Sequence, residues 1–509
     1  MPTKISSNFS EPALALAFDT LKMGKQALIF ANTKRSAEKT AEEIAKQIVD
    51  GNENLLKIAM EAKGSLSTPT RQCERLSYCL RKGIAFHHAG LTQKQKEIVE
   101  DNFRKGVLKI ICCTPTLAYG VDLPAFRVII KDLKRFGRHG LAWIPVLEYL
   151  QQAGRAGRPK YDSLGQAIAI AQSDGERDKI YEMYIKGEPE EIHSKLAVEP
   201  ALRMYVLSLI ATGIVSSREE ISDFFEKTFW AHQYQDPRRL DNIIEKILYM
   251  LEEWEFLRES NGIYTATPIG RRISELYIDP YTAYYLVECL RRGASKTVNI
   301  FSVMHMISST LEMRPRVKAK MKDIEDLQHE VAANHDSLLA EEPPMFEAEY
   351  DDFLDSVKTA MMFTRWAEED TEEILLENFN VRPGELQVKL DMADWLLYAS
   401  HDLCTLLHFP SMRREISKAR FRVKYGIKEE LLPLVRLDQV GRVRARKLYS
   451  NGIKDLGDVK KADIALLSRL LGKNIAALVK KQVGQDMEKI KPEAQHGEAG
   501  FGAPLQRWS

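Results

Sequence analysis

Short apolar runs rich in β-branched residues alternate with amphipathic stretches of helical periodicity between residues 24 and 171. The runs have the length of strands, and the stretches between them carry apolar residues at helical spacing. This alternation predicts an α/β fold, a parallel sheet with crossover helices, in which ligands bind at the strand-terminal loops. The predicted strands are residues 27–30, 84–88, 109–114, 127–130 and 166–171, and the predicted helices include 36–49 and one that ends at Phe103.

Beyond about residue 195 the pattern becomes helical, with one interruption. Ser216 and Ser217 stand three residues before Glu219 and Glu220, so two overlapping capping boxes open a helix there. A second helix and a tight β-hairpin follow, and this order is typical of a winged helix. One interpretation of this domain is DNA contact, and the alternative is a structural spacer. The second helix is predicted over residues 238–253, and the hairpin turns at Asn261 and Gly262.

The rest of the chain divides by composition and periodicity. Residues 280–410 are predicted to form a helical bundle with an acidic connection over 335–349, and residues 420–484 a smaller helical unit. Residues 485–509 are polar and rich in Gly and Pro, which predicts a disordered tail. A short helix over residues 12–21 is interpreted as a docking element or a solvated cap.

Length and composition limit the class of protein. A chain of 509 residues corresponds to about three to five domains. With 44% hydrophobic and 28% charged residues, no apolar run of about 18 residues and no signal pattern at its start, it is expected to be cytoplasmic and to have no membrane partner. The six cysteines are scattered, with no CxxC pair and no His at the spacing of zinc ligands. The sequence therefore predicts neither a disulfide framework nor a zinc site.

The net charge of +1 hides a local excess of positive charge. Residues 411–449 hold twelve Lys or Arg and four Asp or Glu, so this segment alone carries eight excess positive charges. Such a run is either a solvated helix face or a surface for a polyanion.

Two arginines follow an amphipathic helix in the string QQAGRAGRP, residues 151–159. Three residues apart at a helix start, Arg155 and Arg158 point the same way. The small residues around them let a polyanion or another protein lobe approach the backbone closely. Guanidinium groups are always charged and suit a γ-phosphate that develops charge during transfer. The string therefore predicts a phosphate-handling loop.

The string also resembles motif VI of superfamily-2 helicases, in which arginines at these positions reach ATP bound by the other lobe. Residues 113–130 resemble motif V, where a Thr contacts the nucleic-acid backbone and the residue at the Asp122 position links the DNA and nucleotide sites. Residues 27–41 resemble motif IV, and FHHAGL at 86–91 resembles the block that follows it. The order of the four motifs implies the second RecA-like lobe of such a helicase.

The residues of these motifs resemble those of the Ski2-like branch, especially of the archaeal fork-processing DNA helicases related to HELQ and the polymerase-theta helicase. Relatives carry a β-hairpin between motifs V and VI that separates the duplex, and the resemblance implies such a hairpin around Phe136 and Trp143. An aromatic side chain there can stack on the last base pair. The alternative is that both residues fill the core of the lobe.

Residues 384–403 resemble the long ratchet helix of this family, which lies across the unwound strand. Trp395 matches a tryptophan that stacks on a base in relatives, although a Trp at helical spacing also suits a core. Relatives have an Arg seven residues earlier, where this sequence has Val388. The nearest basic residue, Lys389, is on a different face, which puts a two-point ratchet in doubt.

Residues 426–453 resemble the helix-hairpin-helix of the family, which grips the phosphate backbone without reading sequence. Gly441 ends the hairpin. Asp438 and Gln439 stand where relatives usually carry a Gly or a basic residue, which predicts a weaker grip. The basic residues of the next helix are Arg442, Arg444, Arg446 and Lys447.

The sequence contains neither a GxxxxGK[ST] phosphate loop nor an acidic strand-end motif for magnesium. A second lobe contributes arginines to ATP bound between two lobes but cannot hold the nucleotide alone. The resemblance implies an ATP-dependent DNA helicase that moves 3′ to 5′ on single-stranded and forked DNA, with ATP and Mg²⁺ held mainly by the absent first lobe. We expect the first lobe to lie on a separate polypeptide, either because the gene is split or because this chain is shortened. This chain alone is then expected to have no ATPase activity.

The resemblance places the predicted domains and site residues. The domains are an N-terminal junction helix (1–22), the second RecA-like lobe (23–192), a winged helix (193–278), a helical ratchet (279–412), a helix-hairpin-helix (413–484) and the tail (485–509). Gln151, Arg155 and Arg158 are assigned to catalysis; Thr114, Thr116, Gly120 and Asp122 to coupling of ATP and DNA; and Thr33, Lys34, Arg35, His88, Phe136, Trp143, Lys389, Trp395, Arg442, Arg444, Arg446 and Lys447 to DNA binding.

Two other functions stay open. One is a non-catalytic DNA-binding scaffold derived from a helicase, which DNA-stimulated ATPase in the presence of a first lobe would distinguish. The other is an RNA helicase of the same branch. Such relatives usually carry long inserted domains after the motor, so the compact helix-hairpin-helix favours DNA.

Overall fold

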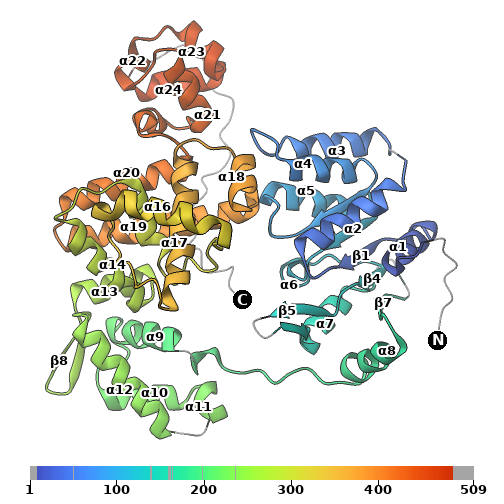
Figure 1. The fold of residues 1–509 in the computed structure, drawn as a ribbon, viewed down its shortest axis with the longest axis horizontal. Coiled ribbons are helices and arrows are strands. Elements are labelled where there is room, and N and C mark those ends of the chain that lie inside the picture. The colour runs from blue at the N-terminus through green and yellow to red at the C-terminus, as the bar shows by residue number, and fades with distance from the viewer. Residues whose placement is uncertain are drawn as a thin grey trace. The chain divides into compact units, whose positions relative to one another are not determined.

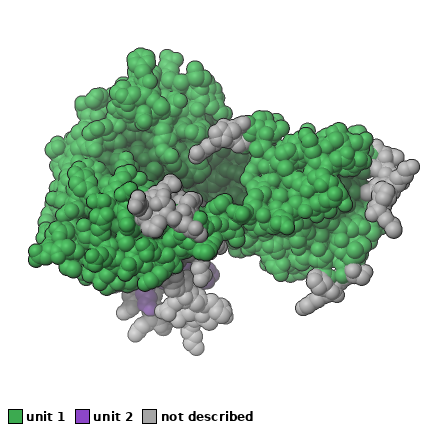
Figure 2. Space-filling model, turned by 90° about the horizontal axis from the view of Figure 1, so that it is seen from below, with its two compact units in different colours: residues 1–365, 370–417 green, residues 366–369, 418–509 purple. Residues whose placement is uncertain are grey.

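The computed structural model describes residues 9–484 except 50, 138–139, 159–161, 163, 198 and 235–236. The predicted tail lies outside the described residues. The chain divides into two compact units, which Figure 2 colours separately. The first unit comprises residues 1–365 and 370–417, and the second comprises residues 366–369 and 418–509.

The first unit begins with a five-stranded parallel sheet of order β2-β3-β1-β4-β7, which confirms the predicted α/β lobe (Figure 1). Every residue of β1 to β4 is buried, which is why these strands read as continuous apolar runs instead of alternating ones. The strands are β1 (Ala27–Phe30), β2 (Ile84–His87), β3 (Ile110–Cys113), β4 (Arg127–Ile130) and β7 (Gln166–Ala169).

Helices connect these strands, as the sequence predicts for crossovers. Thr33, Asn52, Thr70 and Thr92 cap four of them with their side chains, so each begins at a polar residue just after a strand or turn. The helices are α2 (Lys34–Lys46), α3 (Glu53–Lys63), α4 (Arg71–Leu80), α5 (Gln93–Arg104), α6 (Thr116–Gly120), α7 (Val146–Ala153) and α8 (Asp174–Ile180), followed by η1 (Tyr181–Ile185) and η2 (Lys195–Ala197).

The first helix, α1 (Pro12–Lys22), corrects the sequence-based interpretation. We expected a docking element or a solvated cap outside the lobe, but Leu14 and Leu16 belong to the hydrophobic core that surrounds the sheet. The buried Arg127 of β4 donates hydrogen bonds to the Leu16 carbonyl (3.0 Å) and the Thr20 hydroxyl (2.8 Å). The lobe therefore includes α1 and starts before residue 23.

The predicted winged helix follows. Ser217 and Glu220 form a reciprocal capping box at the start of α10, as expected. Asn261 and Gly262 both have positive φ (53° and 80°), which suits the tight turn of the wing. The elements are α9 (Glu199–Ala211), α10 (Arg218–Glu226), α11 (Phe229–Tyr234), α12 (Pro237–Glu253), β8 (Leu257–Ser260), β9 (Ile263–Ala266) and α13 (Pro268–Leu276).

A helical domain completes the first unit, with the 24-residue α19 (Pro383–Leu406) packed against α13, α14 and α15. No helix of the described residues is both long and apolar enough to cross a membrane. The other helices are α14 (Pro280–Gly293), α15 (Ile300–Ser308), η3 (Met321–Asp323), α16 (Ile324–Asn334), η4 (His335–Ser337), α17 (Glu349–Ala367), α18 (Glu372–Phe379) and α20 (Pro410–Tyr425).

The second unit has a small core of its own, formed by short helices around residues such as Leu434, Leu448 and Leu467. Gly441 is the N-cap of α21, which agrees with the predicted hairpin end. The elements are η5 (Glu429–Leu431), η6 (Leu434–Arg436), α21 (Arg442–Ser450), α22 (Leu456–Lys461), α23 (Ile464–Leu471) and α24 (Lys473–Gln482).

A buried carboxylate joins the lobe to the start of α19. Glu38 of α2 lies within hydrogen-bonding distance of His88 Nε2 (3.1 Å) and accepts from Arg382 Nε (3.3 Å), and it is also paired with Arg75. Its side chain is only 2% exposed. Burial alone would raise the pKa of Glu38, but the His88 hydrogen bond and the two guanidinium charges outweigh it and lower the pKa to about 2.

Backbone contact reinforces this joint. The Gly384 amide in the first turn of α19 donates to the Gly90 carbonyl at 3.1 Å. A Cβ at Gly384 would lie 2.1 Å from the Leu91 carbonyl oxygen and 2.5 Å from that of Ala89. Only glycine allows α19 to approach this loop so closely.

We expect Glu38→Gln to lower the free energy of unfolding of the lobe by about 3 kcal/mol, because removing one charge leaves the buried partners uncompensated. Hydrogen exchange of the β1 and β3 amides at increasing urea measures this locally. Glu42→Gln is the matched control, since Glu42 also pairs with Arg75 but is more exposed, and it should cost less than about 1 kcal/mol. Equal losses in both variants would contradict the role of Glu38.

The stability difference between the unsubstituted chain and Glu38→Gln should also depend on pH. The folded pKa of Glu38, about 2, lies below the ordinary 4.5, so the unfolded state binds the proton more readily. The contribution of Glu38 is therefore complete above about pH 4.5 and is lost as the pH falls toward about 2. Exchange measurements across this range test it, and a difference that stays constant with falling pH would be inconsistent.

Candidate functional site

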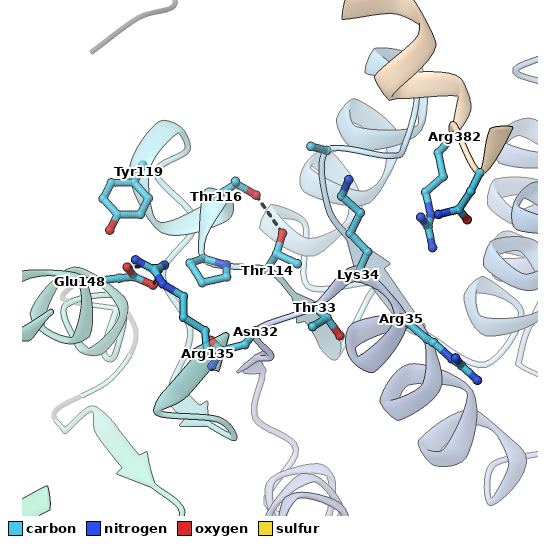
Figure 3. A pocket seen from close by; sticks show the side chains of 13 residues that line it. Asn32, Thr33, Lys34, Arg35, Thr114, Thr116, Tyr119, Arg135, Glu148 and Arg382 are labelled. Atoms are coloured by element: carbon cyan, nitrogen blue, oxygen red, sulfur yellow. Dashed lines mark hydrogen bonds and ion pairs between the residues drawn. The ribbon is translucent and has the colours of Figure 1, made fainter. Parts of the chain in front are cut away.

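The carboxyl ends of β1 and β3 border an open pocket of about 770 Å³ (Figure 3). Phe30 and Cys113 are partners in the parallel register, so the loops that follow them lie side by side. Five residues predicted from motifs IV and V are brought together here. The pocket is lined by Asn32, Thr33, Lys34, Arg35, Ala89, Thr114, Pro115, Thr116, Tyr119, Arg135, Glu148, Asn380 and Arg382.

The predicted residues of this pocket differ in what they offer a ligand. The Thr114 and Thr116 hydroxyls lie 2.9 Å apart, and Thr114 is anchored by its amide to the His87 carbonyl (3.2 Å). Lys34 is paired with Glu385 of α19, and burial together with the Arg382 charge lowers the pKa of its amine. The pocket therefore offers two adjacent hydroxyls held in place by the sheet.

At the start of α2, the Thr33 hydroxyl accepts from the Ser36 amide at 3.0 Å, so its oxygen is already used as the helix cap. Arg35 is exposed and makes no hydrogen bond or ion pair with any other described residue. Arg35 is thus the cation of this pocket most available to an anionic ligand.

Arg135 and Glu148 line the pocket but were not predicted. Arg135 Nη1 donates to Glu148 Oε2 at 2.8 Å, and the Glu148 side chain is almost fully buried. The pair ties a hairpin after β4 to α7, the helix that leads into the two predicted catalytic arginines. Arg135 precedes Phe136 in the predicted hairpin, so strand alternation was the signal that could have placed it on the opposite face.

The predicted duplex-separating hairpin is present as β5 (Lys134–Gly137) and β6 (Gly140–Trp143). Phe136 and Leu141 are cross-strand partners and are 84% and 57% exposed, so one face of the hairpin is apolar and open to solvent. Leu141 was missed by the sequence interpretation.

Trp143 was considered either for stacking on a base pair or for the core of the lobe, and the structure favours the core. The Lys134 ammonium lies 4.3 Å from the centre of its ring, and Tyr184 contacts it edge-on at 6.2 Å. Because Trp143 packs against the core of the lobe, it supports the hairpin and does not belong to its exposed face.

Arg155 and Arg158 lie in the segment that follows the end of α7, and not at a helix start as predicted. Each is partly exposed (25% and 20%). Arg155 donates to the Ala118 carbonyl (2.5 Å) and to Asp122 (3.3 Å). This contact directly connects a residue predicted for catalysis with one predicted for coupling. Asp122 itself is almost fully exposed, as is expected of a group that faces a ligand or another lobe.

Arg158 is held more firmly. It donates to Asp162 (2.6 Å) and to the Gln26 amide oxygen (2.5 Å). The hydrogen bond from Arg158, together with Lys25, lowers the pKa of the buried Asp162 carboxyl to about 2. These contacts fix the orientation of the guanidinium and leave the side chain 20% exposed.

The remaining polar residues of this region are divided between surface and interior. Gly120 is exposed beside Asp122, and the predicted Gln151 is half-buried. The neighbouring Gln152, which was not predicted, is 1% exposed, and neither atom of its amide has a hydrogen-bond partner among the described residues. A buried amide without a partner is costly.

His88 was predicted to bind DNA, and the structure contradicts this. Its ring is 0% exposed, with Nε2 bonded to Glu38 and Nδ1 accepting from the Gly90 amide at 3.1 Å. Burial lowers the pKa of His88, so the ring is neutral and links two elements of the fold. No nucleic acid can reach a side chain in this position.

On α19, Trp395 and Lys389 are half-buried and already have partners. The Trp395 indole donates to the Leu276 carbonyl (3.1 Å), and the Lys389 ammonium donates to the Pro315 carbonyl (2.6 Å). Burial lowers the pKa of Lys389 to about 8. Val388, which replaces the Arg of relatives, is exposed.

In the second unit, the predicted basic helix α21 uses most of its arginines internally. Arg446 pairs with Glu369 and Glu430, and Arg444 donates to the Gln439 carbonyl at 2.7 Å. Arg442 lies 4.8 Å from the centre of the Trp366 ring. Lys447 is exposed. Of the four α21 residues predicted to bind DNA, Arg446 instead stabilises the unit through its two ion pairs.

The described residues contain no cluster of three or more His, Cys, Asp or Glu suited to a metal ion. Each of the six cysteines is free and buried.

Three domain families match the chain. The family described as "Helicase conserved C-terminal domain" matches residues 12–160, a "Helix-turn-helix domain" matches 166–258, and "Archaeal helicase, domain 4" matches 301–426. The first match begins at α1, in agreement with the place of this helix in the lobe.

Several similar proteins carry the description "ATP-dependent DNA helicase Hel308". That of Pyrococcus abyssi is 40% identical over 93% of this chain, that of Pyrococcus horikoshii 38% over 94%, and that of Methanocella arvoryzae 37% over 94%. The chain spans 66% of the length of each. The domain matches, their order and these relatives together show that the chain belongs to the Ski2-like superfamily-2 helicases and corresponds to their C-terminal part.

Proposed function

We propose that this chain is the second motor lobe and the DNA-gripping part of an ATP-dependent DNA helicase that moves 3′ to 5′ and unwinds forked or branched DNA. The observation that carries the proposal is the pocket of Figure 3, in which residues of two separate motifs line one open surface. The descriptions of the similar proteins support the ATP-dependent DNA helicase part of the proposal.

In this proposal a single strand crosses the pocket. Its phosphates bind the hydroxyls of Thr114 and Thr116 and the guanidinium of Arg35. Contacts of this kind position the backbone without reading sequence. The same strand then passes α19, where the half-exposed Trp395 ring stacks on a base.

The hairpin then separates the duplex. Phe136 and Leu141 form an apolar face that replaces the stacking partner of the last base pair, and stacking on an aromatic is worth about 1 to 3 kcal/mol per base. Trp143 and the pair Arg135–Glu148 hold the base of the hairpin against the lobe.

The chain contributes Arg155 and Arg158 to ATP, while ATP and Mg²⁺ are held mainly by the first RecA-like lobe. When bound there, ATP and its metal supply the free energy of translocation. The described residues fit a partial role, because they present two arginines at the lobe edge but no carboxylate cluster for a metal. The Arg155–Asp122 contact connects Arg155 with the loop that follows α6, the helix that begins at Thr116.

The test is to measure ATP turnover with and without a polypeptide carrying the first lobe of a relative. Alone, the chain should bind forked DNA and show no turnover; with the added lobe, ATPase should be stimulated by DNA. Turnover by the chain alone would contradict the proposal, and DNA binding without stimulation would support a scaffold instead.

In the reconstituted pair, Arg158→Lys should reduce ATPase by about 10³-fold or more while DNA binding stays nearly unchanged. Lysine retains the charge beside Asp162 but lacks the guanidinium fork. Arg177→Gln is the control, because Arg177 is an exposed arginine of α8 that pairs only with nearby carboxylates. Loss of DNA binding together with ATPase would indicate misfolding and not a catalytic role.

The neighbouring residues Arg446 and Lys447 should separate stability from DNA binding. Arg446→Gln removes two ion pairs and should destabilise the second unit by about 1 kcal/mol, seen as a lower melting temperature of that unit. Lys447→Gln should leave melting unchanged and weaken binding to forked DNA, with a salt dependence reduced by about one charge. The reverse pattern would show that Lys447 is the structural residue.

A further inference from the structure

Tyr119 is an exposed aromatic residue on the wall of the pocket. It follows Thr116 by three residues on α6, so both side chains project from the same face of this short helix. Tyr119 is 52% exposed, whereas Tyr149 and Tyr184 in the core of the same lobe are 4% and 2% exposed. The ring therefore contributes little to the packing of the lobe.

The ring and hydroxyl of Tyr119 are available to a ligand. Within the part of the chain that the structure describes, no ring stacks on Tyr119, no cation lies over its face and its hydroxyl has no hydrogen-bond partner, while the Arg135–Glu148 ion pair lies beside it. Burial and the nearby Glu148 carboxylate raise the pKa of Tyr119, so the phenol stays neutral beside an anionic ligand.

Groups that hold a nucleic-acid backbone surround this ring. Figure 3 shows Thr116 and Thr114 between Tyr119 and Lys34, with Arg135 and Glu148 next to the ring on the other side. The lining contains four cations and one carboxylate. Lys34, Arg135 and Arg382 are paired with carboxylates, which leaves Arg35 as the cation without such a pair among the described residues. An aromatic platform beside such a polar, cationic track is the arrangement that binds single strands.

We propose that Tyr119 stacks on one nucleobase of the single strand whose phosphates bind Thr114 and Thr116. The inference rests on the DNA-binding function proposed above and adds a base subsite to it. Arg135 lies at the same corner, and the next residue, Phe136, projects from the opposite face of β5. Tyr119 is thus placed to receive a base just after the hairpin has separated it from its partner strand.

The test uses the whole chain and fluorescently labelled oligothymidylate, with affinity measured by anisotropy at a fixed low salt concentration. Tyr119→Leu keeps an apolar side chain but removes the ring, and it should weaken binding by about 5- to 150-fold, the equivalent of one stacked base. Tyr119→Phe retains the ring and should bind as the unsubstituted chain does. Tyr181→Leu is the control, since Tyr181 is 50% exposed but lies outside the pocket under Lys186.

A second series places one abasic nucleotide at each position of the oligonucleotide in turn. In the unsubstituted chain one position should cost affinity, and that cost should disappear in Tyr119→Leu, because ring and base then form a coupled pair. The base subsite is refuted if Tyr119→Leu binds as tightly as the unsubstituted chain, or if the abasic nucleotide still lowers the affinity of Tyr119→Leu by the same factor. Either result leaves the proposed DNA-binding function standing. Failure of the unsubstituted chain to bind any single strand overturns the proposed function as well. Equal melting temperatures confirm that the variants are folded.

Discussion

The arrangement of the first unit depends on one buried carboxylate. Glu38 is nearly inaccessible to solvent and is satisfied by side chains from three other elements, His88 after β2, Arg75 of α4 and Arg382 at the start of α19. A buried charge is tolerated only when such partners surround it. The lobe and α19 are therefore held at a fixed contact, which the close approach of Gly90 and Gly384 makes still tighter.

The position of the pocket follows from this contact. Lys34 lies one turn before Glu38 on α2 and pairs with Glu385 of α19, so one helix borders the pocket with its first turn and anchors α19 with its second. Arg382 lines the pocket and also binds Glu38. A ligand in the pocket thus touches the groups that join the sheet to the helical domain, which gives binding a direct physical route to the rest of the unit.

A second route leads from the same pocket toward the two arginines. Glu148 of α7 holds Arg135 at the base of the hairpin, and the turns after α7 carry Arg155 and Arg158. Arg155 in turn contacts Asp122 in the loop after α6. Because protein interiors are close-packed, a displacement of one of these elements is transmitted to its neighbours. The hairpin, the pocket and the arginine edge are in this way parts of one connected surface.

The sequence by itself determined the features that depend on neighbouring residues. The strands at 27–30 and 127–130, the Ser217 capping box, the Asn261-Gly262 turn and the arginine string were all predictable, because apolar periodicity and cap spacing are local patterns. Only the tertiary structure decided which polar or aromatic residues of those motifs face solvent. His88 is turned inward by Glu38, 50 positions away, and Trp143 by packing against Tyr184. Arg446 stays partly exposed but is held by Glu369, 77 positions away. Partners so distant in sequence leave no local pattern. Tyr119, Leu141 and Arg135 lie close to predicted residues in the sequence, but their exposure or pairing depends on how the strands and helices pack.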